Sequence, residues 1–194
     1  MRVASKAAVV LALLTSVLLV DVVAAKNKDR NVPLDPKFAG IQSITLLPVV
    51  DLRIDKKDRI DLAKIGERAV QILKDRNYPA VQADSTGTAG EIAEEDLQES
   101  KAEWIKRLGL SADRWIMVVC LFDVHTKRSQ TNAEFGGYLF DKETGEVIWK
   151  RRGFGQAGDN TEIGGLSGMG LRHWTKKDAL NNAVDALLGS IPKR

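Results

Sequence analysis

The sequence is poor in the residues that carry most metal and thiol chemistry. Among its 194 residues are one cysteine and two histidines. The single cysteine, Cys120, excludes an intramolecular disulfide, and its place in an apolar run predicts a buried thiol. Neither His125 nor His173 has a cysteine or a second histidine at ligand spacing. We therefore expect no metal and no organic cofactor.

An excess of charge of one sign is also missing. Lysine and arginine number 29 and aspartate and glutamate 26, for a formal net charge of +3. This near-neutral balance gives no electrostatic basis for nucleic acid as the main partner. The Gly-x-Ser-x-Gly string of many serine hydrolases is absent from the sequence as well.

The sequence has no apolar run long enough for a typical membrane span. The mainly apolar stretch Ala7–Val20 has 14 residues, whereas a spanning helix needs about 20. The basic residues Arg2 and Lys6 precede it, and the small residues of Val23–Ala25 follow, as in a secretory signal. We expect a signal peptide over residues 1–25, cleaved after Ala25, export to the periplasm, and no stable membrane insertion after cleavage. No cysteine lies near the end of the run, so no lipid anchor is expected.

The mature chain is predicted to hold an extended lead-in (26–40) and one domain (41–192). Hydrophobic periodicity, turn residues and helix caps divide this domain into alternating elements. The predicted elements are a strand at 41–51, a helix between an N-cap at Asp58 and a left-handed stop at Asn77, a strand at 78–83, a helical region at 91–108 broken near Ser100, strands at 115–122, 133–140 and 146–153, and a last helix from Thr175 to Gly189 whose core face is Leu180, Ala183, Val184, Leu187 and Leu188. Pro48 marks either an edge position of the first strand or the place where its ladder pairing stops.

The run Trp115–Phe122 is predicted to be a central strand covered on both faces. A polar bend is expected at Asp123–Gln130, and a tight hairpin at Asp141–Gly145. The early strand–helix–strand order favours parallel pairing, whereas the hairpin requires antiparallel pairing. The expected fold class is α/β (α+β), a mixed sheet of about five strands with helices packed on it.

A glycine-rich segment, Gly153–Gly170, contains the letters G-x-G-x-x-G. A dinucleotide site requires a helix directly after those glycines, and the residues that follow do not favour one. The segment is instead interpreted as a long loop. Two roles remain open for it: a functional loop that covers a groove or contacts a partner with Met169 and Trp174, or a flexible connector.

Two groups of charged residues are candidates for a binding surface. Lys150 and Arg152 share one face of a predicted strand and, with Arg172, suit an anionic glycan, lipid head group or acidic protein, although a merely solvated face is the alternative. The other group lies at the carboxyl end of the first strand, where open α/β sheets bind ligands. The candidate partner or ligand surface comprises Asp51, Arg53, Asp55, Lys150, Arg152, Met169, Arg172 and Trp174.

Four stretches, Ile44–Asp51, Leu73–Tyr78, Leu108–Ile116 and Tyr138–Trp149, resemble bacterial envelope domains. The group includes the curli-secretion lipoprotein CsgG, the LpoB-type outer-membrane activators of penicillin-binding proteins, the amino-terminal domain of TolB, and small lipoprotein-like proteins of unknown role. The resemblance covers about residues 41–192. It implies a mixed sheet flanked by helices and a non-enzymatic binding or assembly module in the periplasm.

Three functions follow as hypotheses. The first is an exported, non-enzymatic module that binds an envelope protein partner. The second is a periplasmic small-ligand-binding protein or sensor with its site near Asp51–Asp55, roofed by the glycine-rich segment. The third is a hydrolase that uses Asp51, Asp123 or His125.

Overall fold

The computed structural model describes residues 35–83, 92–109, 113–127, 130–158 and 176–194, and all structural statements concern these ranges. The predicted signal peptide lies outside them. The six strands form one sheet in the order β3-β1-β4-β5-β6, with β2 also paired to β4. The strands are β1 (Ile44–Leu46), β2 (Val50–Asp51), β3 (Ala80–Gln82), β4 (Trp115–Lys127), β5 (Gln130–Asp141) and β6 (Glu146–Gly158), and the helices are α2 (Pro36–Ala39), α3 (Leu62–Asp75), α4 (Glu94–Glu99), α5 (Ala102–Ile105) and α6 (Lys176–Leu188).

The predicted first strand is present as two short ones. Both β1 and β2 pair in parallel with β4, through Thr45 with Ile116 and Val50 with Cys120. Pro48 lies between them and has no amide hydrogen to donate, so the ladder is interrupted there. Of the two roles predicted for Pro48, the stop in ladder pairing is confirmed, and pairing resumes at β2. The mixed sheet has six strands.

Helix α3 connects β1 and β2 to β3, which pairs in parallel with β1 as the strand–helix–strand order predicts. The predicted cap at Asp58 is wrong: Asp61 caps the helix by accepting a hydrogen bond from the Lys64 amide at 3.2 Å. Asp58 instead forms an ion pair with Lys176 at the start of α6. At the other end, Asn77 has a φ of 66°, which confirms the predicted left-handed stop.

The antiparallel meander β4-β5-β6 forms the larger part of the sheet. The first seven residues of β4 are buried, which confirms the central strand. Burial also raises the pKa of the Cys120 thiol to about 12. The predicted bend at 123–130 is wrong, because β4 continues to Lys127 and β5 begins at Gln130. His125 pairs with Asn132 in this extension. The polar side chains here are consistent with a strand that is exposed to solvent on one face.

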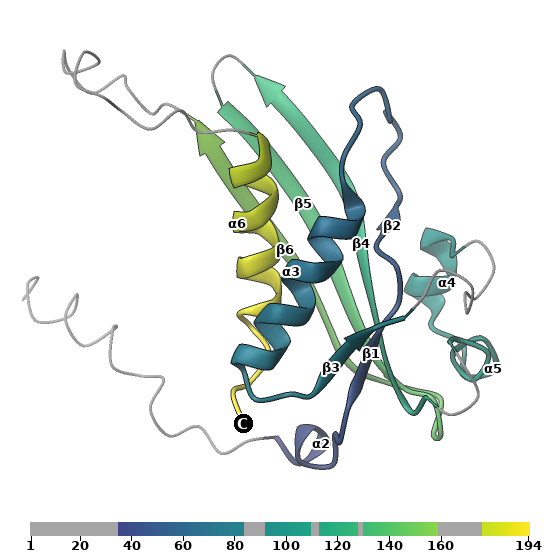
Figure 1. The fold of residues 1–194 in the computed structure, drawn as a ribbon. Helices are drawn as coiled ribbons and strands as arrows, with labels where there is room; N and C mark the ends of the chain where they lie inside the picture. The colour runs from purple at the N-terminus through teal and green to yellow at the C-terminus, as the bar shows by residue number, and fades with distance from the viewer. Residues whose placement is uncertain (1–34, 84–91, 110–112, 128–129, 159–175) are drawn as a thin grey trace, which may run out of the picture. The chain divides into compact units, whose positions relative to one another are not determined.

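Helices cover both faces of the sheet. On one face α3 and α6 lie side by side (Figure 1). On the other face, Leu97 of α4 and Ile105 of α5 pack against Tyr138 and Phe140 of β5. The predicted break between these two short helices is confirmed at Ser100, whose φ is 48°. None of the described helices combines the length and the apolar character that a bilayer crossing requires.

The first glycines of the predicted loop belong to β6, so the prediction of a loop over Gly153–Gly158 is wrong. Helix α6 packs directly on this strand. A Cβ atom on Gly155 would lie 2.2 Å from the carbonyl oxygen of Ala179, and one on Gly153 would lie 2.5 Å from the Cβ of Leu187. The letters G-x-G-x-x-G therefore reflect close helix–strand packing.

The predicted extended lead-in does not hold for its last residues. Residues 36–39 form α2, which Asp35 caps by accepting a hydrogen bond from the Lys37 amide at 3.0 Å. Pro36 occupies the first turn, where its missing amide hydrogen costs nothing. Phe38 is buried. Part of the lead-in thus packs with the domain.

Candidate functional site

The candidate site is the surface that β4, β5 and β6 present beyond α4 and α5. In Figure 1 the upper ends of the three strands extend above these two helices. Cross-strand register places Arg152 beside Gly136 and Phe154 beside Glu134, and side chains of paired residues point to the same face. We call the surface formed by Phe122, Glu134, Arg152 and Phe154 the meander face.

Arg152 is held in place from three sides. Its guanidinium group donates hydrogen bonds to the carboxylate of Glu134 and, at 3.4 Å, to Glu94 of α4. The guanidinium carbon lies 4.2 Å from the centroid of the Phe122 ring. The hydrogen bond with Glu134 is the main reason that the pKa of Arg152 is raised. Arg152 is therefore charged and ordered while 45% of its side chain stays exposed.

Phe122 lies across a glycine. A Cβ atom on Gly136 would come within 2.4 Å of the Phe122 ring, so only glycine leaves room for this ring position. Beyond it, Phe154 is 65% exposed. Lys150 lies on the same face, with its ammonium group 5.1 Å from the centroid of the Tyr138 ring. The predicted pairing of Lys150 and Arg152 on one face is confirmed.

Asp51 and Arg53 form an internal ion pair. Two nitrogens of Arg53 donate to the two carboxylate oxygens of Asp51 at 2.9 and 2.8 Å, and one also donates to the Asp58 carbonyl at 3.0 Å. Hydrogen bonding to Arg53 holds the pKa of Asp51 below its ordinary value. Because only 4% of the Arg53 side chain is exposed, this pair holds the loop after β2, whereas Asp55 pairs with Lys57 in solvent.

The residues considered for hydrolysis, Asp51, Asp123 and His125, do not form one site. The His125 Nδ1 atom lies 2.7 Å from the Asp123 carboxylate, and both side chains are more than half exposed. Asp51 pairs with Leu121, whose side chain points to the face that carries α3 and α6, whereas Asp123 is paired with Glu134 on the meander face. Within the described ranges, no three His, Cys, Asp or Glu side chains are grouped to hold a metal ion.

The candidate residues Met169, Arg172 and Trp174 lie outside the described residues, as does the rest of the glycine-rich segment. Of the eight predicted surface residues, the structure brings Lys150 and Arg152 together on the meander face. Asp51 is the last residue of β2, and Arg53 and Asp55 belong to the loop that follows it.

No protein-family model and no curated protein sequence matches the chain. The fold resembles that of PelC. The PelC dodecamer from Paraburkholderia phytofirmans is 10% identical, with a TM-score of 0.50 over 85% of this chain and 96% of that chain. Lipoprotein GNA1162 from Neisseria meningitidis is 16% identical, with a TM-score of 0.40 over 64% and 89%. The LpoB C-terminal domain from Escherichia coli is 11% identical, with a TM-score of 0.35 over 58% and 81%.

A lipoprotein and an LpoB domain are among these neighbours, as the resemblance predicts, and the likeness concerns the fold alone. The likeness to CsgG and TolB stays a prediction. At 10% identity, the likeness to PelC concerns the fold and assigns no activity.

The sequence alone did not point to Phe122, Glu134 and Phe154. Glu134 and Phe154 stand in strand segments with alternating polarity, which signals one wet face. That alternation does not show that Phe154 is on the wet side, because the glycines beside it obscure which residues of β6 point inward. The pairing of β5 with β6 decides the matter, because it places Phe154 beside Glu134 on the exposed face.

Proposed function

We propose that this protein is an exported, non-enzymatic binding or assembly module of the bacterial cell envelope, and that it acts through protein–protein contacts on the meander face. The observation that carries the proposal is the exposure of Phe154 next to the ordered Arg152. Aromatic and arginine side chains dominate the binding energy of protein interfaces. An exposed phenylalanine on a strand is otherwise a liability for solubility.

The arrangement around Arg152 suits a protein partner for a second reason. Because Glu134 and the Phe122 ring already fix the guanidinium group, binding orders few additional rotamers, and less entropy is lost. Arg152 lies over the Phe122 ring and Glu134 is paired with Phe154, and charged groups beside apolar anchors are typical of the rim of an interface. PelC, whose fold this chain resembles, is a dodecamer. A protein of similar fold thus assembles through protein–protein contacts, which supports the proposal.

Substitution of Phe154 by serine is expected to lower recovery of the envelope partner about tenfold or more, because the substitution removes the apolar anchor of the interface. The measurement is affinity purification of the tagged, full chain from its host after crosslinking, with quantitative mass spectrometry of the proteins that are captured. The mass of the crosslinked species shows whether the partner is a second copy of the chain.

Val81→Ser is the matched control. Val81 is 59% exposed and lies on β3, the strand at the opposite end of the sheet order from β6. Both substitutions replace an exposed apolar side chain on a strand, so neither is expected to change the melting temperature by more than a small amount. Equal recovery of the partner by the two variants would contradict a role for the meander face.

A further inference from the structure

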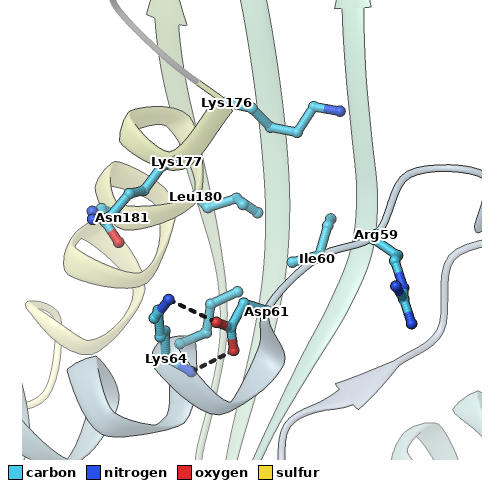
Figure 2. Close-up of a pocket in the computed structure, with 9 residues that line it drawn as sticks. Arg59, Ile60, Asp61, Lys64, Lys176, Lys177, Leu180 and Asn181 are labelled. Atoms are coloured by element: carbon cyan, nitrogen blue, oxygen red, sulfur yellow. Dashed lines mark hydrogen bonds and ion pairs between the residues drawn. The ribbon is translucent and has the colours of Figure 1, made fainter.

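A cavity of about 290 Å³ lies between the first turns of α3 and α6 (Figure 2). These two helices cover the face of the sheet opposite to the meander face, so the cavity is a separate feature from the proposed protein-binding surface. Its lining residues come from two segments more than a hundred positions apart in the chain, and are Arg59, Ile60, Asp61, Lys64, Ile65, Lys176, Lys177, Leu180 and Asn181.

The inner part of the cavity is apolar. Ile65 and Leu180 are buried core residues, 5% and 7% exposed. Ile60 and Leu180 point toward one another from the loop before α3 and from α6 (Figure 2). An apolar group of a ligand that displaces water from this surface makes binding more favourable.

The charged groups around the cavity are mainly cationic. Lys64 pairs with Asp61 at 2.9 Å, and Lys176 pairs with Asp58. Among the described residues, Lys177 has no ion pair. With Arg59, the cavity and its ion-pair partners hold four cationic side chains against two carboxylates, which leaves a surplus of two positive charges.

The position of two of these lysines is unfavourable without a ligand. Lys176 and Lys177 occupy the first turn of α6, where the helix dipole disfavours cations. Asp178 in the same turn offsets part of this cost. A local conflict of this kind is a common mark of a functional site.

We propose that this cavity binds a small amphipathic anion, a carboxylate that carries a short apolar chain or ring. The carboxylate would lie beside Lys177, and the apolar part would cover Ile60, Ile65 and Leu180. The volume is just under the range of roughly 300–1,000 Å³ that ligand pockets span, which favours a short chain over a long acyl chain. The inference does not depend on the proposed protein contacts.

Octanoate is the probe that tests this assignment. Titration into the ¹⁵N-labelled protein is expected to shift the amide resonances of residues 60–65 and 176–181 in a saturable way. 1-Octanol and octylamine have the same chain without the negative charge, and each is expected to bind about tenfold more weakly or worse. Equal affinity for octanoate and octanol would overturn the proposal, and so would the absence of saturable shifts up to about 10 mM octanoate.

Lys177→Gln is expected to weaken octanoate binding about three- to tenfold, because it removes one of the cations without touching the core. Lys106→Gln, at an exposed position next to α5, is the control and should bind as the wild type does. Unchanged amide positions away from the cavity would show that the Lys177 variant is folded. A protein that ignores octanoate but binds phosphatidylglycerol vesicles would overturn the small-ligand assignment.

Discussion

Substitution of Gly155 by alanine is expected to lower the free energy of unfolding by about 3 kcal/mol, at the upper end of the cost of overpacking a core. The new methyl group would lie 2.2 Å from the Ala179 carbonyl oxygen and 2.2 Å from the Ala183 amide nitrogen. Both are backbone atoms of α6, so no side-chain rotation relieves the contact and the helix has to move off the sheet. For a chain of this size, the melting temperature should fall by about 6–12 °C.

Thermal and urea unfolding of the purified protein measure this effect. Gly40→Ala is the matched control, because a Cβ atom there has only the Trp115 ring nearby, at 4.0 Å. The same change at Gly40 should stay within about 0.5 kcal/mol of the wild type. If Gly155→Ala were as stable as Gly40→Ala, the close packing of α6 on β6 would be wrong.

Substitution of Arg53 by alanine is expected to cost about 2–3 kcal/mol. The change leaves the Asp51 carboxylate without its two strongest donors and the Asp58 carbonyl without its partner. Breaking a fully buried ion pair costs about 3–5 kcal/mol. The Asp51 side chain is 18% exposed, so water replaces part of what is lost. Urea unfolding at neutral pH measures the difference.

The acid limb of the stability curve provides an independent readout of the same pair. Because the pKa of Asp51 is held below its ordinary value of 3.8, its stabilisation is complete above that value and is lost as the pH falls through the folded-state pKa. The difference between wild type and Arg53→Ala should therefore narrow below about pH 4. Lys57→Ala removes the exposed pair with Asp55 in the same loop and should cost at most about 1 kcal/mol. Equal costs for the two substitutions would contradict an internal role for Arg53.

Burial explains which parts of the fold the sequence predicts well. The strand β4 is covered on both faces over its first seven residues, so its sequence is an unbroken apolar run. Helix α6 buries one stripe, and the predicted core positions Leu180, Ala183 and Leu187 are buried. Pro48 marks the interrupted ladder because proline has no amide hydrogen.

The parts that were mispredicted have sequences whose composition is ambiguous. The outer half of β4 around His125 is polar because its side chains face water, and such a composition is also typical of a loop. Glycines in β6 mimic a loop because α6 approaches the backbone of Gly153 and Gly155 too closely for any side chain. The polar composition of outer β4 and the glycines of β6 can be explained only when the elements packed beside these strands are known.

The candidate sites depend still more on tertiary placement. Ile60 and Leu180 are far apart in the sequence, so only the folded structure shows that they line the same cavity. Arg152 was predicted from its charge, but its contacts with Glu134 and Phe122 arise from the register of three strands. Arg53 was predicted as part of a binding surface from its place at a strand end. The structure shows that its side chain is hydrogen-bonded inside the loop.

Photocrosslinking in the living host from position 154 tests the central claim most directly. A photoreactive phenylalanine analogue replaces Phe154 in one strain and Val81 in the other, because both positions are exposed on strands. The proposed function predicts one recurrent covalent adduct with an envelope protein from position 154 and none from position 81. The absence of an adduct at position 154, or the same adducts at both positions, would contradict a protein-binding role for the meander face.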